Sequence, residues 1–153
     1  MAAKKKAAGP LDGVRVLDFS MFLAGPYAGR LLADHGADVI KIEPPGGETI
    51  RGAHPVVDGK SRYFAQLNAG KRCIVLDLKS EAGTAAIKKL ITDTDVVLEN
   101  FRPGVLDRLG LGFETLSAIN PRLIYCAISG YGPTGPNSTR PAFAPIVHAH
   151  AGY

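Results

Sequence analysis

The chain has 153 residues, of which 46% are hydrophobic and 21% are charged, and this composition is typical of one globular domain. No apolar run approaches the roughly 20 residues that a membrane-spanning helix needs. Lys4, Lys5 and Lys6 stand in the N-terminal sequence MAAKKKAAGP, and without them 15 basic residues face 14 acidic ones. The body of the chain is therefore nearly neutral, which argues against a nucleic-acid-binding surface.

The N-terminal residues predict a disordered Ala/Lys tail over 1–9, followed by one domain over 10–153. The tail lacks the apolar stretch of a signal peptide. Cys73 and Cys126 stand among aliphatic residues of two predicted strands, so we expect both to be buried free thiols. Free thiols are consistent with a reducing, cytoplasmic location.

Strand-like and helix-like patterns alternate in the first half of the chain. Residues 14–19 predict a strand, 23–35 a helix that ends before Gly36, and 38–43 a second strand. Residues 46–70 show little periodicity and predict a long loop with a short helix near 63–67. A loop of that length in a compact domain is more often functional than not.

The alternation continues in the second half. Residues 73–78 predict a third strand, and Ser80 is a suitable N-cap for the helix that follows. Residues 95–100 predict a fourth strand, after which Pro103 suits the first turn of a short helix. A helix over 113–119, a strand over 123–128, a turn-rich segment over 130–136 and a helix within 142–153 complete the order.

Strands that are apolar on both faces and alternate with helices predict a parallel sheet covered on each side. We therefore expect an α/β fold with a Rossmann-like, doubly wound parallel sheet. Ligands of such sheets bind outside the carboxyl ends of the strands. The segments expected there are 20–25, 43–47, 79–80, 99–102 and 129–135.

An NAD-type dinucleotide and a metal ion are two ligands that fit the sequence poorly. Glu43 ends the second strand, as does the acidic ribose ligand of NAD-binding folds, but the segment Gly25–Gly29 lacks the G-x-G-x-x-G spacing that a pyrophosphate requires. His148 and His150 alternate, yet no Cys, Asp or Glu stands near them. We therefore expect no metal site and no resident cofactor.

Six segments in order resemble the family III CoA-transferases, the carnitine dehydratase and bile-acid-inducible protein F type. The segments are Pro10–Asp18, Leu23–Tyr27, Leu32–Pro44, Asn68–Lys79, Val97–Gly104, and Asn120–Tyr125 with Ser129–Gly132. The resemblance implies the N-terminal part of a fold in which two subunits pass through each other as interlocked rings. It also implies that the smaller domain and the C-terminal return of that fold are absent from these residues.

In that family an aspartate carboxylate attacks an acyl-CoA thioester and forms an enzyme-bound mixed anhydride. The acceptor acid then displaces the acyl group from this anhydride. The resemblance thus implies an acyl-CoA and a carboxylic acid as substrates, and a homodimer. It places CoA contacts, including a segment that borders the thioester, at Leu23, Ala24, Leu76, Asp77, Leu78, Lys79, Asn100, Phe101, Arg102, Arg108, Pro141, Ala142, Phe143 and Ala144. Taken singly, Lys79, Arg102 and Arg108 would be read as solvated surface charges.

The sequence departs from the family pattern in two ways. The nucleophilic aspartate stands in an Ala/Gly-Asp-x-x-x-Gly motif that no aspartate of this chain matches, so we assign no nucleophile. Racemase members carry Gly-His-Asp where this chain has Ala142-Phe143-Ala144, and these side chains cannot take a proton from an α-carbon. We expect the CoA-binding part of a CoA-transferase that is inactive by itself. The alternatives are a non-catalytic CoA-binding subunit or scaffold, and an NAD-type protein.

Overall fold

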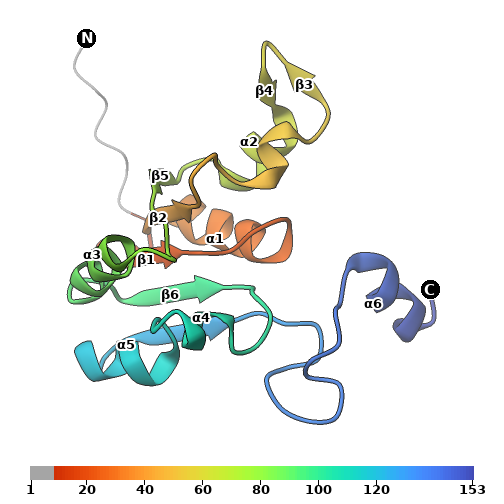
Figure 1. Cartoon of the computed structure of the whole chain (residues 1–153). Coiled ribbons are helices and arrows are strands. Elements are labelled where there is room, and N and C mark those ends of the chain that lie inside the picture. Colours follow the sequence, from red (N-terminus) through yellow and green to blue (C-terminus); the bar gives the residue numbers. More distant parts are fainter. Residues whose placement is uncertain (1–8) are drawn as a thin grey trace.

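A five-stranded parallel sheet forms the centre of the computed structural model, which describes residues 9–153 (Figure 1). Residues 1–8 of the predicted disordered tail lie outside the described residues. The strand order is β5-β2-β1-β6-β7. The bounds are β1 (Arg15–Asp18), β2 (Asp38–Glu43), β5 (Arg72–Val75), β6 (Val96–Glu99) and β7 (Ile124–Ala127). The five predicted strands and the parallel sheet are confirmed.

Helices occupy the connections between these strands, and one more helix follows β7. They are α1 (Ala24–Asp34), α2 (Arg62–Asn68), α3 (Glu81–Ile91), α4 (Val105–Arg108), α5 (Phe113–Ile119) and α6 (Ala144–Ala151). Ser80 caps α3 as predicted, because its Oγ accepts a hydrogen bond from Gly83 N at 3.0 Å. Pro103 was expected in the first turn of a helix, but α4 begins only at Val105, after Gly104 turns the chain in the left-handed conformation (φ 81°).

The strand order makes the sheet doubly wound. The chain starts at the central strand β1, moves outward through β2 to β5, then returns past β1 to β6 and continues to β7. Right-handed crossovers in opposite directions place their helices on opposite faces of the sheet. The order matches the first five strands of the 3-2-1-4-5-6 Rossmann arrangement.

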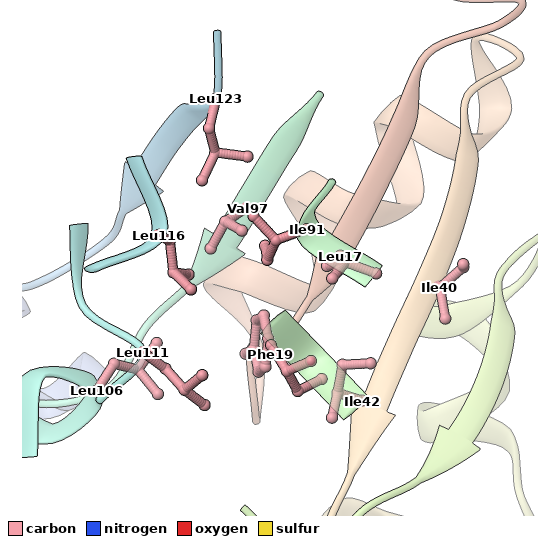
Figure 2. Packing of buried hydrophobic residues seen from close by; sticks show 11 residues of the cluster. Leu17, Phe19, Ile40, Ile42, Ile91, Val97, Leu106, Leu111, Leu116 and Leu123 are labelled. Carbon is pink, nitrogen blue, oxygen red and sulfur yellow. The ribbon is translucent and has the colours of Figure 1, made fainter. Parts of the chain in front are cut away.

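The two faces of the sheet carry separate apolar clusters. On one face, Val16, Val39 and Leu98 pack with Ala33 of α1. On the other, Leu17 and Val97 face Ile91 of α3, Leu116 of α5 and their neighbours (Figure 2). Adjacent residues such as Val16 and Leu17 therefore point to opposite faces, as strands with alternating side-chain directions require.

Segment 46–70 was predicted as a long loop with a short helix near 63–67. The helix is confirmed as α2, but the rest of the segment is more ordered than a loop. It contains a 3₁₀ turn at Thr49–Gly52, a hairpin of β3 (Val56–Val57) and β4 (Lys60–Ser61), and then α2. Asp58 and Gly59 form the hairpin turn with φ of 50° and 71°. An Asp-Gly pair between short β-prone runs is the local signal for such a turn, and periodicity over a longer window does not detect it.

The prediction of two buried thiols is wrong, because both cysteines are exposed. Cys73 lies on β5 and Cys126 on β7, and these strands form the two edges of the sheet. Val75 on β5 and Ile124 on β7 are also 60% and 62% exposed. The sheet is therefore covered on both faces at its centre but not along its edges.

A buried ion pair joins the central strand to the helices on one face. Lys71 Nζ lies 2.7 Å from Asp18 Oδ2, and neither side chain is accessible to solvent. The same ammonium donates to Pro26 O in α1 at 2.8 Å and to Asn68 Oδ1 in α2 at 2.9 Å. Burial lowers the pKa of Lys71, while Asp18 opposes that shift. One side chain thus holds β1, α1 and α2 together.

Replacing Lys71 by Ala should lower the free energy of unfolding by about 3–5 kcal/mol, because Asp18 would keep a buried charge without its partner. The matched control is Arg72→Ala, since Arg72 is 63% exposed and pairs with Asp38 at the surface. That control should cost less than about 1 kcal/mol. Chemical denaturation of both variants measures the difference, and equal losses would contradict a structural role for the buried pair.

Candidate functional site

A cleft of about 770 Å³ lies at the carboxyl ends of β1 and β6, where the chain changes direction across the sheet. Four segments form its walls: the residues after β1, after β6 and after β7, and the segment that leads into α6. The lining residues are Met21–Ala24, Asn100–Pro103, Ile128–Gly130, Ser138, Arg140–Ala144, Val147 and His148. This is the position where open α/β sheets bind ligands.

The cleft brings together nine of the fourteen residues that the sequence predicted for CoA contact. They are Leu23, Ala24, Asn100, Phe101, Arg102, Pro141, Ala142, Phe143 and Ala144. Phe22 lies within segment 20–25, which was expected at the carboxyl ends of the strands, although it was not assigned to CoA. Prediction from the sequence missed Arg140, Val147 and His148 as wall residues. Their only signal was position close to the predicted segment 141–144.

The remaining five residues line neither this cleft nor the smaller cavity beside it. Leu76–Lys79 follow β5, at the edge of the sheet and two strands away from β1. The predicted third strand extended to Leu78, but β5 ends at Val75 and a turn follows, in which Asp77 Oδ1 accepts Lys79 N at 2.9 Å. Leu76 and Leu78 pack against the core, so only Asp77 and Lys79 are exposed there.

Arg108 is the last residue of α4 and is exposed. Its guanidinium folds back towards Gly104, since a Cβ placed on that glycine would lie 3.3 Å from Arg108 Nη1. Gly104 belongs to the turn that follows Phe101 and Arg102 after β6. Within residues 9–153, Lys79, Arg102 and Arg108 make no side-chain hydrogen bond or ion pair with the protein. These three cations therefore remain able to meet an anionic ligand.

Asn100 shapes the cleft by holding the loop after β1. Its Oδ1 accepts Met21 N at 2.7 Å, and its Nδ2 donates to Met21 O at 2.7 Å. The amide thus completes two hydrogen bonds with one backbone unit, in the manner of a paired strand. The side-chain amide of Asn100 is therefore engaged with the loop that forms one wall of the cleft.

Gly25 lets the start of α1 approach the same loop closely. A Cβ at this position would lie 2.2 Å from Ser20 Cβ and 3.3 Å from Asn100 Cγ. Ser20 is itself fixed, because its backbone N–H and its hydroxyl both donate to Asp18 Oδ1. Any side chain at Gly25 would therefore displace the residues that form the cleft wall.

Two aromatic rings of the cleft wall contact each other. Phe22, after β1, and Phe143, before α6, meet edge to face with ring centroids 6.2 Å apart. Both rings are about half exposed, at 45% and 58%. Apolar walls with a few cations near them suit a ligand that is apolar at one end and anionic at the other.

Glu43 was considered as a ribose ligand, but its carboxylate is occupied inside the protein. Arg51 donates from Nε and Nη2 to the two oxygens of Glu43, each at 2.6 Å, and Glu48 N adds a bond at 3.0 Å. Burial raises the pKa of Glu43, but these donors outweigh it and lower the pKa to about 2. A buried carboxylate with three donors is not free to bind a sugar hydroxyl.

A second cavity of about 230 Å³ lies next to the cleft and shares Phe101, Arg102 and Ser129 with it. Its wall includes Glu99, a nearly buried carboxylate that accepts Phe101 N at 2.7 Å. Burial raises the pKa of Glu99, and the charge of Asp107 adds to the shift. Because Glu99 accepts the backbone N–H of Phe101, it helps to fix the turn that contains Phe101 and Arg102.

Within residues 9–153, no three His, Cys, Asp or Glu side chains gather in a way that would hold an ion. His148 and His150 lie on α6, where they contact Tyr153 and Tyr131 respectively. No helix in that part of the chain has both the length and the apolarity needed to span a bilayer.

The fold is a Rossmann-like domain with a cleft where the strand order reverses, the position at which open α/β sheets bind ligands. Residues 11–153 match the model of CoA-transferase family III, and the chain belongs to that family. It is 49% identical over 148 residues to the acetyl-CoA:oxalate CoA-transferase of Acetobacter aceti, covering 96% of this chain and 38% of that protein.

Two further relatives are similar to this chain over nearly its whole length. The succinyl-CoA–D-citramalate CoA-transferase of Chloroflexus aurantiacus is 48% identical over 146 residues, which are 94% of this chain and 36% of that protein. A crystal structure of a CaiB/BaiF family protein from Brucella suis has 43% identity and a TM-score of 0.90, over 95% of this chain and 40% of that one. The chain thus spans less than half the length of these relatives.

Replacing Gly25 by Ala should disturb the cleft and cost about 1–3 kcal/mol of stability, because the added methyl group overlaps Ser20. Gly52→Ala is the control, since no atom lies within 4 Å of a Cβ at Gly52. That change should be neutral or stabilising by about 0.4–1 kcal/mol. Denaturation curves and the amide NMR shifts of residues 20–24 would compare the two variants. Unchanged shifts in Gly25→Ala would contradict the close packing.

Proposed function

We propose that the protein containing this chain is an acyl-CoA:carboxylate CoA-transferase, and that residues 10–153 form its CoA-binding part. The observation that carries the proposal is the cleft at the point where strand order reverses, in a chain of CoA-transferase family III. Its walls combine residues that the resemblance assigns to CoA with apolar surface beside them. The small domain and the C-terminal return of the fold would belong to the rest of the protein.

The chemistry follows from the family resemblance. An aspartate carboxylate attacks the thioester carbonyl, the carbon–sulfur bond breaks, and CoA leaves as its thiolate while a mixed anhydride forms. The acceptor carboxylate then attacks the aspartyl carbonyl of this anhydride, and the first acid leaves as a free carboxylate while a second mixed anhydride forms. The CoA thiolate attacks the acceptor's carbonyl carbon in that anhydride, so that the new thioester forms and the aspartate leaves as a carboxylate. Covalent catalysis divides a difficult acyl transfer into easier steps. CoA acts here as a substrate, and the reaction needs no resident cofactor.

This chain would contribute binding and orientation. The apolar wall at Leu23, Ala24 and Phe143 suits the pantetheine arm and the thioester. Arg102 and Arg108 offer planar guanidinium groups, which form paired hydrogen bonds with phosphate oxygens. The proposal names carboxylic acids as a class, because one relative is named for oxalate and another for D-citramalate.

The interlocked homodimer belongs to the same proposal. Exposed apolar side chains on both edge strands, Val75 and Ile124, provide surface that further chain could cover. A cytoplasmic location stays a prediction from the sequence.

Two alternatives differ in class. A non-catalytic CoA-binding subunit is supported by the lack of an aspartate that matches the family motif in these residues, and a separately encoded partner chain would favour it. An NAD-type protein is disfavoured, because Glu43 is already bound by Arg51 and Glu48.

Replacing Arg108 by Ala should weaken CoA binding by about 1–3 kcal/mol, the usual scale for a lost charge-assisted hydrogen bond. Arg122→Ala is the control, since Arg122 is exposed just before β7, at the opposite end of the strands. Isothermal titration of the wild type and both variants with CoA and with NAD measures the effect. Equal CoA affinity in all three would remove Arg108 from the site, and tighter binding of NAD would favour the dehydrogenase-type alternative.

The 153-residue chain by itself should transfer no CoA between an acyl-CoA and an acid, because it contains no aspartate in the family's nucleophile motif. A coupled assay with acetyl-CoA and oxalate, and with succinyl-CoA and citramalate, would detect turnover. Turnover that is lost on changing one of the chain's own aspartates would refute this expectation.

A further inference from the structure

The backbone of Phe22 is unusual and forms part of the cleft wall. Its φ is 66°, in the left-handed region that residues other than glycine seldom adopt. In residues 9–153, Asp58 is the only other such residue, and it lies in an exposed hairpin turn. Phe22 precedes Leu23 and Ala24, and its ring meets Phe143. Its conformation therefore decides the direction of this wall.

A buried side chain from a distant segment holds Phe22 in place. Glu48 Oε1 accepts the backbone N–H of Phe22 at 2.6 Å. Glu48 is only 2% exposed. Strained backbone persists only where its surroundings determine it strongly, and a short hydrogen bond to a buried carboxylate provides such a determinant.

Glu48 is itself fixed through both its side chain and its backbone. Its Oε2 lies 2.7 Å from Lys41 Nζ, and both of these side chains are 1% exposed. Lys41 also donates to Ser20 O at 2.7 Å, two residues before Phe22. The backbone N–H of Glu48 donates to Glu43, which Arg51 holds. Gly46 and Gly47, with φ of 89° and 82°, let the chain turn. This turn precedes Glu48, whose side chain reaches Phe22 in the loop after β1.

We propose that Glu48 is a positioning residue of the cleft: its buried carboxylate fixes Phe22 in the left-handed conformation and so sets Leu23 and Ala24 against the ligand. The effect on CoA rests on the proposed function, whereas the effect on Phe22 does not. Glu48 lies outside the cleft walls and acts only through the loop. The competing explanation is that Glu48 only neutralises the buried charge of Lys41.

A pair of double variants separates these two roles. Lys41→Met with Glu48→Gln removes the ion pair but keeps an acceptor for Phe22 N–H. Lys41→Met with Glu48→Met removes the ion pair and the acceptor, with side chains of similar volume and no buried charge. Exposed Glu114→Gln, in the first turn of α5, is the surface control.

The measurements are the amide NMR shift of Phe22 and the CoA affinity by calorimetry, each on folded protein. We expect the Gln variant to resemble the wild type in both. In the Met variant the Phe22 amide proton should move upfield, and CoA should bind about tenfold more weakly, within the usual range for coupled sites. If both double variants fail to fold, the single variants Glu48→Gln and Glu48→Met carry the test through the same two measurements. Both leave Lys41 without its partner, and only Glu48→Met removes the acceptor of Phe22 N–H.

The outcomes distinguish this proposal from the proposed function. Equal Phe22 shifts and equal CoA affinities in the Gln and Met variants would show that Glu48 only neutralises Lys41, and would overturn the proposal. A changed Phe22 shift with unchanged CoA affinity would overturn the effect on the ligand. If the wild type bound no CoA, the proposed function would fail, while the Phe22 shift would still decide whether Glu48 positions the loop.

Discussion

The reversal of strand order between β1 and β6 is the constraint on which the rest of this structure depends. Connections that leave β1 in one direction place α1 and α2 on one face, and those that return past it place α3 to α5 on the other. The loops after β1 and β6 therefore separate, since their chains leave towards opposite faces. The cleft occupies the space between them, and these two loops form two of its walls.

Polar groups beneath the cleft give this space a defined shape. Lys71 joins β1, α1 and α2, Asn100 holds Met21, and Glu48 holds Phe22. Apart from the contact of Lys71 with Asn68, which lies 3 positions away, these contacts join residues that are 26 to 79 positions apart. Buried hydrogen bonds and ion pairs are costly to break in one partner only. The loop after β1 is thus irregular in conformation but closely determined in position.

Local patterns failed where the outcome depended on a residue's place in the whole sheet. Cys73 and Cys126 stand in apolar runs just as the central strands do, yet they are exposed because β5 and β7 are edge strands. The strand predicted over residues 73–78 likewise ends at Val75, where a turn follows. Nothing in a run of apolar residues says which strand will be central.

The sequence by itself determined the strands, most of the helices, the parallel sheet and the family. These depend on periodicity, caps and turn residues, which act over a few positions, and on motifs in a fixed order. The tertiary structure alone decided which strand ends meet at the cleft, that Glu43 is bound by Arg51, and that Glu48 reaches Phe22. Such contacts join residues far apart in the chain, and packing and burial select them from many partners of the same chemical type.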